Sequence, residues 1–373
     1  MAKILIFSGD DMSFYKFRKE LIVRLHELGH EVVLATKFSD YEARLAELGC
    51  RTVDLDALKR RGANALQDLE LIRAYKKIIR DFCPDVILTY TLKPRVYGDL
   101  AAGKKTPIIN TITGMGAYTL NGGALAKIAT VLDKVGLRNA NHVFFQNVEA
   151  RDIYLQRKLL KNTIPTTVVM GSGVNLETFP YQDYPDHEGV DFAFVGRIMK
   201  DKGVEELFYA AEQLKKNYGE HVRVHIFGFY EENYKPVIED LQARGIICYH
   251  GFVSDLQPRL KNMDCIVLPS YHEGVGNAIQ EASASGRPVI ASNIPGCNTV
   301  VEDGLNGYLC KARDKEDLLE QMEKIMGLSA REREEMGKQG REKMVREHDR
   351  NKIIETYINV IHGIVGHKEA AER

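Results

Sequence analysis

The sequence predicts an α/β protein built from two doubly wound domains, each organised around a parallel sheet. At 373 residues the chain exceeds one ordinary domain. Short apolar runs alternate with helical periodicities, as in right-handed βαβ units. The alternation stops at 171–189, where Gly, Pro, Asp and Tyr follow no period, and then restarts. We therefore expect a first domain at 1–172, a linker at 173–189, a second domain at 190–348 and a C-terminal helix at 349–373.

The first half contains six short apolar runs that are typical of buried strands. They are Lys3–Ser8, Glu31–Thr36, Asp85–Thr89, Pro107–Thr111, His142–Gln146 and Thr166–Met170. Between the first two runs, apolar residues recur every three or four positions from Phe14 to Leu28. This spacing predicts one helix, closed by Gly29 and His30.

The second half repeats the alternation. Its expected strands are Phe192–Gly196, Val222–Phe227, Ile246–His250, Cys265–Pro269, Pro288–Ala291 and Tyr308–Cys310. The chain is helical in pattern from Lys315 onward. Its last segment places six apolar residues on one face: Ile353, Ile354, Tyr357, Ile358, Ile361 and Val365. Such a stripe must be buried, and we expect it to pack back on the first domain.

The composition is that of a folded protein, with 44% hydrophobic and 28% charged residues. The apolar run at the N-terminus is too short for a signal peptide and is followed at once by Asp10 and Asp11. The longest uncharged stretch, 106–126, is too polar and glycine-rich to span a membrane. Six scattered cysteines without C-x-x-C spacing indicate a reducing cytosol rather than a disulfide framework or a zinc site. We therefore expect a cytoplasmic protein.

The net charge of −1 conceals a basic half and an acidic half. Up to Pro180 the chain holds 26 Lys and Arg against 19 Asp and Glu, and the remainder holds 25 against 33. This asymmetry indicates that the first half meets an anionic partner.

One basic stripe is visible in the first half. Arg73, Lys76, Lys77 and Arg80 share one helix face, shortly after Lys59-Arg60-Arg61. The opposite side, expected to be buried, would consist of Leu66, Leu69, Ile72, Tyr75 and Ile79. A charged stripe is usually only a solvated face. Near an anionic membrane, however, each Lys or Arg contributes about 1 kcal/mol, so the stripe is also a candidate membrane contact.

The strongest chemical signal lies at 268–292. Glu273 is expected in a loop after a strand, and Glu281 inside a helix that begins near Gly276. Two carboxylates separated by seven residues suit an extended ligand with hydroxyl groups at both ends, such as a nucleotide sugar. The helix start at Gly274-Val275-Gly276-Asn277 offers free N–H groups for a diphosphate. The alternative is a solvated helix with ordinary surface glutamates.

This segment resembles the E-x7-E signature of glycosyltransferase family 4, whose members have the GT-B fold and retain anomeric configuration. Gly196-Arg197 with Lys202-Gly203 is similar to the family's strand-end G-R-x-x-x-x-K-G. The segments TLKPRVYGDLAAG and NTITGMG resemble bacterial members that extend undecaprenyl-diphosphate-linked sugars for capsule, O-antigen or glycoprotein glycans. The resemblance covers essentially the whole chain and implies two Rossmann-like domains that face each other across a cleft.

The resemblance also implies roles for individual residues. Arg197 and Lys202 would bind the donor diphosphate, Glu273 the transferred sugar and Glu281 the ribose. Gly9 and Gly196, each at a strand end, would lie close to the donor. The turn Gly251-Phe252-Val253 would border the base. Arg gives a planar fork and Lys a mobile point charge, so the pair can neutralise the leaving diphosphate. The alternative for Arg197 and Lys202 is a surface ion pair near Asp201 and Glu205.

We expect no metal and no cofactor. The D-x-D at Asp54 and Asp56 is the element by which GT-A transferases hold a divalent cation, but here we interpret it as a solvated loop. Gly114 and Gly116 form a lone G-x-G without a third glycine, which makes a dinucleotide site improbable. This loop is instead a candidate for contacting an acceptor phosphate.

No Asp or Glu stands out as a nucleophile. Retaining enzymes of this resemblance are thought to use a front-face mechanism, in which the leaving phosphate takes the acceptor proton. Many relatives have a His in the turn after the fourth strand, where this chain has Tyr90-Thr91-Leu92-Lys93. Lys93 is our candidate for contacting the donor or acceptor phosphates. We interpret His272 as a packing or turn residue.

These inferences predict a glycosyltransferase that acts at the inner face of the cell membrane. Its donor would be a UDP-sugar carrying an N-acetylhexosamine, a hexose or a uronic acid, and its acceptor an undecaprenyl-diphosphate-linked saccharide. The expected partners are the two substrates and an anionic membrane surface, with no nucleic acid. The alternatives are an epimerase or phosphorylase of the same fold, and a non-catalytic sugar-nucleotide-binding scaffold.

Overall fold

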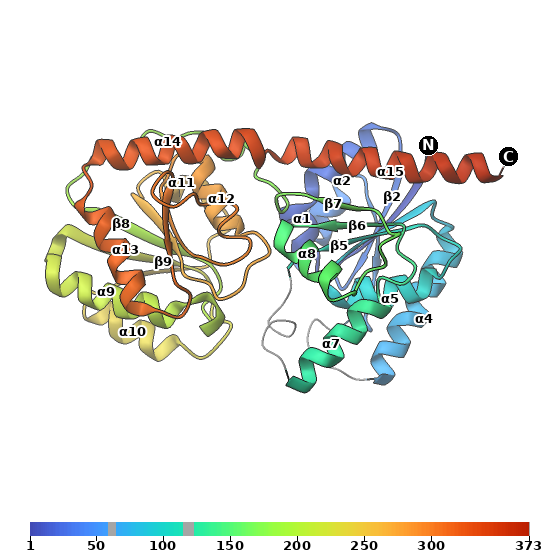
Figure 1. Ribbon diagram of the computed structural model, residues 1–373, viewed down its shortest axis with the longest axis horizontal. Coiled ribbons are helices and arrows are strands. Elements are labelled where there is room, and N and C mark those ends of the chain that lie inside the picture. Colours follow the sequence, from blue (N-terminus) through green and yellow to red (C-terminus); the bar gives the residue numbers. More distant parts are fainter. Residues whose placement is uncertain (59–64, 115–122, 373) are drawn as a thin grey trace. The chain divides into compact units, whose positions relative to one another are not determined.

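A computed structural model describes residues 1–58, 65–114 and 123–372 of the chain (Figure 1). It consists of two compact units. Unit 1 comprises Met1–Ser172 together with Asn351–Arg373, and unit 2 comprises Gly173–Arg350.

Unit 1 is built around a parallel sheet whose seven strands have the order β3-β2-β1-β4-β5-β6-β7. The strands are β1 (Lys3–Phe7), β2 (Glu31–Thr36), β3 (Arg51–Asp54), β4 (Val86–Tyr90), β5 (Ile108–Ile112), β6 (His142–Phe145) and β7 (Thr166–Val168). The apolar runs in the sequence predict all of these except β3. That strand is polar and only partly buried, because it pairs with β2 alone at the edge of the sheet.

Helices cover both faces of this sheet. They are α1 (Asp11–Phe17), α2 (Lys19–Glu27), α3 (Glu42–Ala46), α4 (Ala65–Phe82), α5 (Leu92–Ala102), α7 (Gly123–Val135) and α8 (Val148–Gln156). Successive residues of β1 point to opposite faces, so Ile6 packs with Leu21 of α2, whereas Phe7 packs with Tyr75 of α4.

The single helix predicted between the first two strands is wrong. The chain forms α1 and α2 instead, which are separated at Arg18. The Arg18 guanidinium donates to the carbonyl oxygen of Phe17 and lies 4.2 Å from the centre of the Tyr90 ring. These contacts hold Arg18 outside the helical conformation, which apolar periodicity does not reveal.

The C-terminal helix α15 (Arg350–Glu372) packs on unit 1 beside α2, as the sequence predicts (Figure 1). Ile354, Tyr357 and Ile361 are buried in the same cluster as β1 and α2. The Tyr357 ring stacks on Phe144 of β6 at 4.0 Å between centroids. An ion pair of 3.1 Å joins Arg24 and Glu355.

Unit 2 contains a six-stranded parallel sheet with the order β10-β9-β8-β11-β12-β13. The strands are β8 (Val190–Val195), β9 (Val222–Phe227), β10 (Cys248–Gly251), β11 (Cys265–Leu268), β12 (Val289–Ser292) and β13 (Gly307–Cys310). If β8 to β13 are numbered 1 to 6, their order in the sheet is 3-2-1-4-5-6. Strands β1 to β6 of unit 1 have the same order. Both sheets therefore have the doubly wound topology, as predicted.

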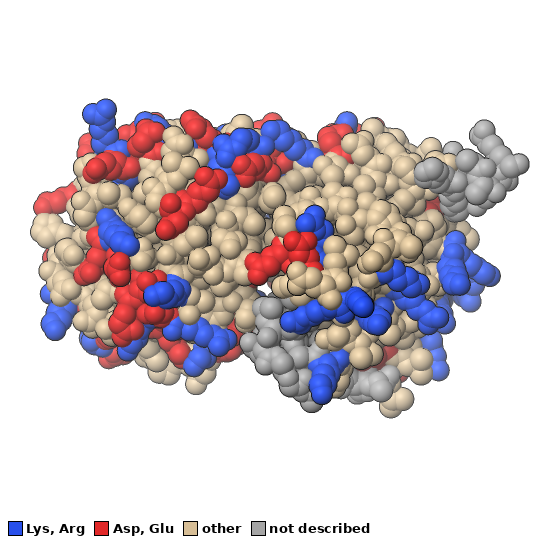
Figure 2. Space-filling view, viewed as in Figure 1, with Lys and Arg blue, Asp and Glu red and all other residues tan. Residues whose placement is uncertain are grey.

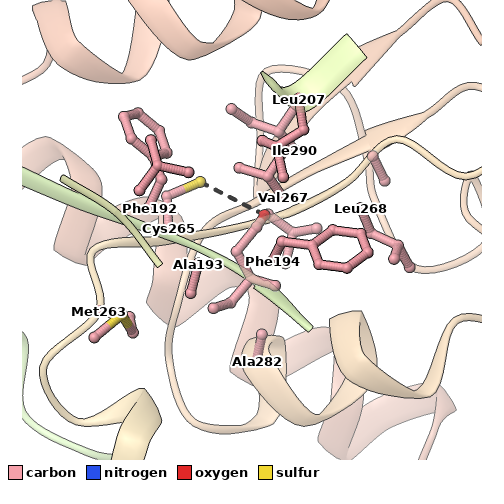
Figure 3. Packing of buried hydrophobic residues seen from close by; sticks show 14 of the residues in the cluster. Phe192, Ala193, Phe194, Leu207, Met263, Cys265, Val267, Leu268, Ala282 and Ile290 are labelled. Atoms are coloured by element: carbon pink, nitrogen blue, oxygen red, sulfur yellow. Dashed lines mark hydrogen bonds between the residues drawn. The ribbon is translucent and has the colours of Figure 1, made fainter. Parts of the chain in front are cut away.

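The helices of unit 2 pack around a single core. They are α9 (Val204–Tyr218), α10 (Lys235–Ala243), α11 (Gln257–Leu260), α12 (Asn277–Ala284), α13 (Lys315–Gly327) and α14 (Ala330–Glu347), with the short 3₁₀ turns η1 (Lys200–Lys202) and η2 (Gly219–His221). Figure 3 shows Phe192 and Phe194 of β8 packed with Cys265 and Val267 of β11. These central strands are buried on both faces, which explains their continuous apolar sequence.

Residues 173–189 belong to unit 2. They are held by Arg287, a fully buried residue whose guanidinium donates to the carbonyl oxygens of Gln182 at 3.0 Å and Asp183 at 2.8 Å. The side chain of Tyr181 packs over Gly286, where a Cβ would lie 2.5 Å from the ring. Although residues 173–189 show no apolar periodicity, contacts with the rest of unit 2, above all the hydrogen bonds from Arg287 to their backbone, hold them in place.

Within the described ranges, no helix combines the length and hydrophobicity that crossing a bilayer requires. The six cysteines are free thiols.

Candidate donor site in unit 2

The candidate site lies at the carboxyl-terminal edge of the unit 2 sheet, where ligands bind in doubly wound folds. Gly196 and Arg197 directly follow β8, and Lys202 ends η1. Glu273 lies in the loop between β11 and α12. Because β8 and β11 are neighbours in the sheet, residues far apart in sequence come together at this edge.

Lys202 and Glu273 form a partly buried ion pair. The Lys202 ammonium donates to Oε1 of Glu273, and the Ser270 hydroxyl donates to the same oxygen at 2.8 Å. The two side chains of the pair are only 16% and 13% exposed. The ammonium and the carboxylate are therefore held against each other where solvent screens them weakly.

Arg197 has a different partner, Glu231, at 3.4 Å. The alternative hypothesis placed Arg197 and Lys202 in surface ion pairs near Asp201 and Glu205. Instead, Glu205 pairs with Lys200 at 3.1 Å, a neighbour whose side chain is 61% exposed.

Glycine backbones bring these elements close together. Gly203 has φ +70°, and a Cβ there would lie 2.1 Å from the carbonyl oxygen of Pro269. This close approach sets η1 against the end of β11, which explains how Lys202 reaches Glu273. Gly296, in the segment after β12, has φ +89°, and a Cβ there would lie 2.2 Å from the carbonyl oxygen of Gly274, in the loop that also holds Glu273. Both positions need the conformational freedom of glycine.

The loop enters α12 through Gly276, which is the N-cap and has no side-chain cap. Val275 is buried, and Asn277 begins the helix, as the sequence predicts. An uncapped helix start leaves backbone N–H groups available to an anion. Glu281 lies on α12 with its side chain partly exposed.

His272 immediately precedes Glu273. Burial is the largest influence on His272 and lowers its pKa, which keeps the ring neutral at pH 7. Its Nε2 is closed off from solvent and has no hydrogen-bond partner among the described residues. These features favour the packing role over an acid–base role.

Phe252 and Val253 follow β10 and line an open hollow of about 650 Å³, together with His225, Phe227 and His250. The Phe252 ring contacts Phe229 edge-to-face at 6.1 Å between centroids, and both rings are exposed. Exposed aromatic rings beyond β9 and β10 offer surfaces on which a base could stack. The sequence predicts a base contact at Phe252 and makes no such prediction for Phe229, although the aromatic pair Phe229-Tyr230 after a strand is a visible signal.

In unit 1, Gly9 follows β1 and touches the turn after β4. A Cβ at Gly9 would lie 2.7 Å from Oγ1 of Thr91. Thr91 itself has φ 68° and ψ 164°, a conformation used almost only by glycine. The turn that lacks the usual histidine is therefore strained and packed over Gly9.

Lys93 does not extend into solvent. Its ammonium pairs with Asp68 of α4 at 3.2 Å, and its side chain is 21% exposed. Gly114 follows β5 and has φ 143°, whereas Gly116 lies outside the described residues. The structure thus places Lys93 in a contact between α4 and α5.

The basic stripe on α4 is exposed at all four positions, Arg73, Lys76, Lys77 and Arg80. Asp81 contacts Lys77 at 2.7 Å and Arg80 at 3.2 Å. Lys59-Arg60-Arg61 lies outside the described residues. Figure 2 shows Lys and Arg side chains gathered on the visible face of unit 1, whereas unit 2 displays both signs.

The prediction that Leu66 and Leu69 are buried is wrong. They are 74% and 43% exposed. A spacing of three to four residues carries Leu66 and Leu69 onto the same helix face as Arg73, rather than opposite it.

The D-x-D residues face a lysine. Asp54 ends β3 rather than lying in a loop, and Asp56 follows it. Lys37 Nζ contacts both carboxylates at 2.6 Å. Within residues 1–58, 65–114 and 123–372, no three His, Cys, Asp or Glu side chains converge in a way that could hold a metal ion.

Two family models match the chain, one in each half. Residues 182–343 match the model described as glycosyl transferases group 1, and residues 17–165 match a glycosyl transferase 4-like domain. The chain belongs to glycosyltransferase family 4. Gly196, Arg197, Lys202 and Glu273 all lie within the segment that matches the group 1 model.

This glycosyltransferase is similar to known proteins over most of its length. It is 25% identical over 333 residues to an N,N'-diacetylbacillosaminyl-diphospho-undecaprenol alpha-1,3-N-acetylgalactosaminyltransferase of Campylobacter jejuni, which covers 84% of this chain and 86% of the relative. Sucrose-phosphate synthase of Thermosynechococcus elongatus has a similar structure, with a TM-score of 0.80, 19% identity and coverage of 98% and 100%. Anabaena Alr3699/HepE, solved in complex with UDP, gives a TM-score of 0.78 at 15% identity, with coverage of 97% and 100%. The structural similarity establishes the GT-B fold of the enzyme.

Proposed function

We propose that this glycosyltransferase transfers a hexosyl residue from a UDP-sugar to an undecaprenyl-diphosphate-linked saccharide, with retention of anomeric configuration. The transferred sugar would be an N-acetylhexosamine, a hexose or a uronic acid. The product would serve the assembly of a surface polysaccharide or a glycoprotein glycan. The name of the Campylobacter relative supports the lipid-linked acceptor, and the UDP complex of the Anabaena protein supports the donor class.

The observation on which the proposal mainly rests is the Lys202–Glu273 pair at the carboxyl-terminal edge of the unit 2 sheet. In a donor complex, the Lys202 ammonium would turn to the diphosphate. The Glu273 carboxylate would then accept hydrogen bonds from sugar hydroxyls. In the free enzyme the ammonium and the carboxylate are each other's partner, so neither charge is buried unpaired.

Arg197 would add a second positive charge. Negative charge on the diphosphate grows as the bond to the anomeric carbon breaks, and Arg197 and Lys202 would stabilise it. The uncapped start of α12 after Gly276 would supply N–H groups to the same oxygens. Together these groups can stabilise the negative charge on the leaving diphosphate, which a divalent cation does in metal-dependent enzymes. We therefore propose catalysis that does not require metal.

Glu281 would bind the ribose hydroxyls, and Phe252 and Val253 would border the base. In a front-face reaction, the departing phosphate oxygen takes the proton of the acceptor hydroxyl while the new bond forms on the same face. This step needs no protein nucleophile. Gly9, Lys93 and the loop with Gly114 and Gly116 would lie toward the phosphates of donor or acceptor, and Lys93 would have to leave Asp68 to do so.

The same proposal places the enzyme on the cytoplasmic face of the cell membrane. A polyprenyl acceptor is reached only at the bilayer, and the basic residues Arg73, Lys76, Lys77 and Arg80 are exposed on unit 1. They would contact anionic lipid headgroups.

The test is a reaction of purified enzyme with a panel of UDP-sugars and a polyprenyl-diphosphate-linked saccharide. The expected result is one preferred donor and a lipid product extended by one sugar. If UDP is released without an acceptor as fast as in the complete reaction, the result would instead indicate an epimerase-like reaction. Binding of a UDP-sugar without any turnover would indicate a scaffold.

A further inference from the structure

A fully buried histidine, His348, is the C-cap of α14 in unit 2. Its ring contacts two other parts of this unit. The side-chain Nε2 of Gln280, on α12, lies 2.7 Å from Nδ1 of His348. Nε2 of His348 lies 3.3 Å from the carbonyl oxygen of Thr299. The ring therefore joins α12 to the segment that follows β12.

The two partners determine the protonation state of the His348 ring. A carbonyl oxygen only accepts hydrogen bonds, so the contact with Thr299 requires a proton on Nε2. An amide N–H only donates, so the contact with Gln280 requires a free lone pair on Nδ1. One neutral tautomer meets both conditions. Burial, together with the nearby Lys343 ammonium, lowers the pKa of His348 to about 4, which keeps the ring neutral at pH 7.

The contact with Gln280 fixes the helix on which the donor site is built. Gln280 is 1% exposed and directly precedes Glu281, to which we assign the ribose. Its backbone N–H donates to the carbonyl oxygen of Gly276 at 3.1 Å, so Gln280 lies one helical turn from the start of α12. That start supplies the N–H groups that we assign to the diphosphate. A hydrogen bond that holds Gln280 therefore holds both donor-binding features of α12.

The contact with Thr299 supports the loop that carries Glu273. The Thr299 hydroxyl donates to the carbonyl oxygen of Gly296 at 2.8 Å. Gly296 lies so close to the loop that an added Cβ would be 3.0 Å from the carbonyl oxygen of Glu273. His348 thus supports, through Thr299 and Gly296, the backbone of the residue to which we assign the transferred sugar.

The backbone around His348 is itself held in place. The carbonyl oxygen of His348 accepts from the N–H of Val174 at 2.9 Å, and the carbonyl oxygen of Val174 accepts from the N–H of Arg350 at 3.1 Å. The Arg350 guanidinium donates to the carbonyl oxygen of Gly173 at 3.0 Å. Because its backbone is fixed on both sides, the His348 ring is a stable support for its two partners.

We propose that His348 is a positioning residue for the nucleotide-sugar donor. Its ring holds α12 and the turn at 296–299 in the arrangement in which Glu281 and Glu273 bind one ligand together. The inference rests on the proposed function, from which it takes the roles of these two carboxylates. Because His348 is fully buried, it acts through Gln280 and Thr299 and not by contact with the donor.

The test is the dissociation constant of UDP, measured by calorimetry on the full chain, together with the donor KM and kcat. His348→Leu removes both hydrogen bonds, and Gln280→Leu removes the contact with α12 alone. Both variants should weaken UDP binding by roughly tenfold, the effect of one lost buried hydrogen bond. Both should raise the donor KM more than they lower kcat, because ribose is bound alike in ground and transition states. His348→Asn keeps an oxygen that can accept from Gln280, and should bind UDP more tightly than His348→Leu.

Ile325→Ala is the control for a general loss of stability in unit 2. Ile325 is fully buried on α13, which packs against α9 and β13. This variant should lower the melting temperature and leave the dissociation constant of UDP at the parental value. If His348→Leu and Gln280→Leu show that same pattern, the two residues only stabilise unit 2 and the proposal is overturned. Should His348→Leu not fold, Gln280→Leu decides, because Leu is well tolerated in a helix.

UDP binding separates this test from the proposed function. A parent that binds UDP but transfers no sugar would refute the proposed function, and the UDP affinities of the variants would still decide the role of His348. A parent that binds neither UDP nor any UDP-sugar would refute both.

Discussion

Replacing Lys202 by Ala removes the ammonium from the pair at the centre of the donor site. In the free enzyme this leaves Glu273, whose side chain is 13% exposed, with Ser270 still donating to Oε1. In the donor complex it removes the charge that we assign to the leaving diphosphate. Both consequences lower the rate, and the second acts in the transition state.

The magnitude follows from the burial of the pair. Loss of one charge-assisted contact to a developing anion costs about 2.7 kcal/mol or more, which corresponds to roughly 10²-fold in kcat/KM. Removal of one partner from a fully buried ion pair costs 3–5 kcal/mol of stability. Because this pair retains some exposure, we expect a smaller loss of about 1–3 kcal/mol, which is compatible with a folded variant.

The assay is kcat/KM for the donor at saturating acceptor, with denaturant unfolding measured in parallel. Lys200→Ala is the matched control. It removes the same charge two residues earlier in η1, where the side chain is 61% exposed and pairs with Glu205. The control should stay within a few-fold of the parent. A Lys202→Ala enzyme as active as the Lys200→Ala enzyme would refute the diphosphate role.

Four further predictions concern the same site. Arg197→Ala should also lower kcat/KM by roughly 10²-fold; activity within a few-fold of the parent would remove its role. Glu281→Ala should raise the donor KM more than it lowers kcat, because ribose is bound alike in ground and transition states; an equal fall in kcat and kcat/KM at constant KM would contradict this. Activity should survive EDTA, and a loss that Mg²⁺ restores would return attention to Asp54 and Asp56. Gly203→Ala should destabilise unit 2 by about 2 kcal/mol or more and raise the donor KM, since its Cβ would meet the Pro269 carbonyl. The control for backbone strain is Gly245→Ala, because Gly245 has φ +66° and no atom within 4 Å of an added Cβ. Equal losses of stability in the two variants would argue against the steric cause.

Much of the fold could be predicted because the parallel strands are buried on both faces and therefore form continuous apolar runs. β4 and β5 are buried at each position, and the sequence finds both. The apolar pattern does not predict β3, because this strand is only partly buried and its sequence, RTVD, is polar. The break between α1 and α2 at Arg18 is not predicted either, because side-chain contacts, not apolar spacing, determine where α1 ends.

The candidate site could be predicted as a set of residues but not as a set of contacts. Glu273 and Lys202 are 71 residues apart, and only the adjacency of β8 and β11 brings them together. Nothing local in the sequence identifies Glu231 as the partner of Arg197, or Asp68 as the partner of Lys93. The exposure of Leu66 was misjudged, although helical periodicity places it on the face of Arg73.

The most direct test of the central claim is the structure of the product formed from a UDP-sugar and a polyprenyl-diphosphate-linked saccharide. Mass spectrometry of the lipid fraction reports the added sugar, and NMR of the new glycosidic linkage reports its anomeric configuration. We predict addition of one sugar with the same anomeric configuration that it has in the donor, dependent on Lys202 and Glu273. An inverted linkage would contradict the retaining front-face reaction. Absence of any lipid-linked product with each donor tested would contradict the proposed acceptor.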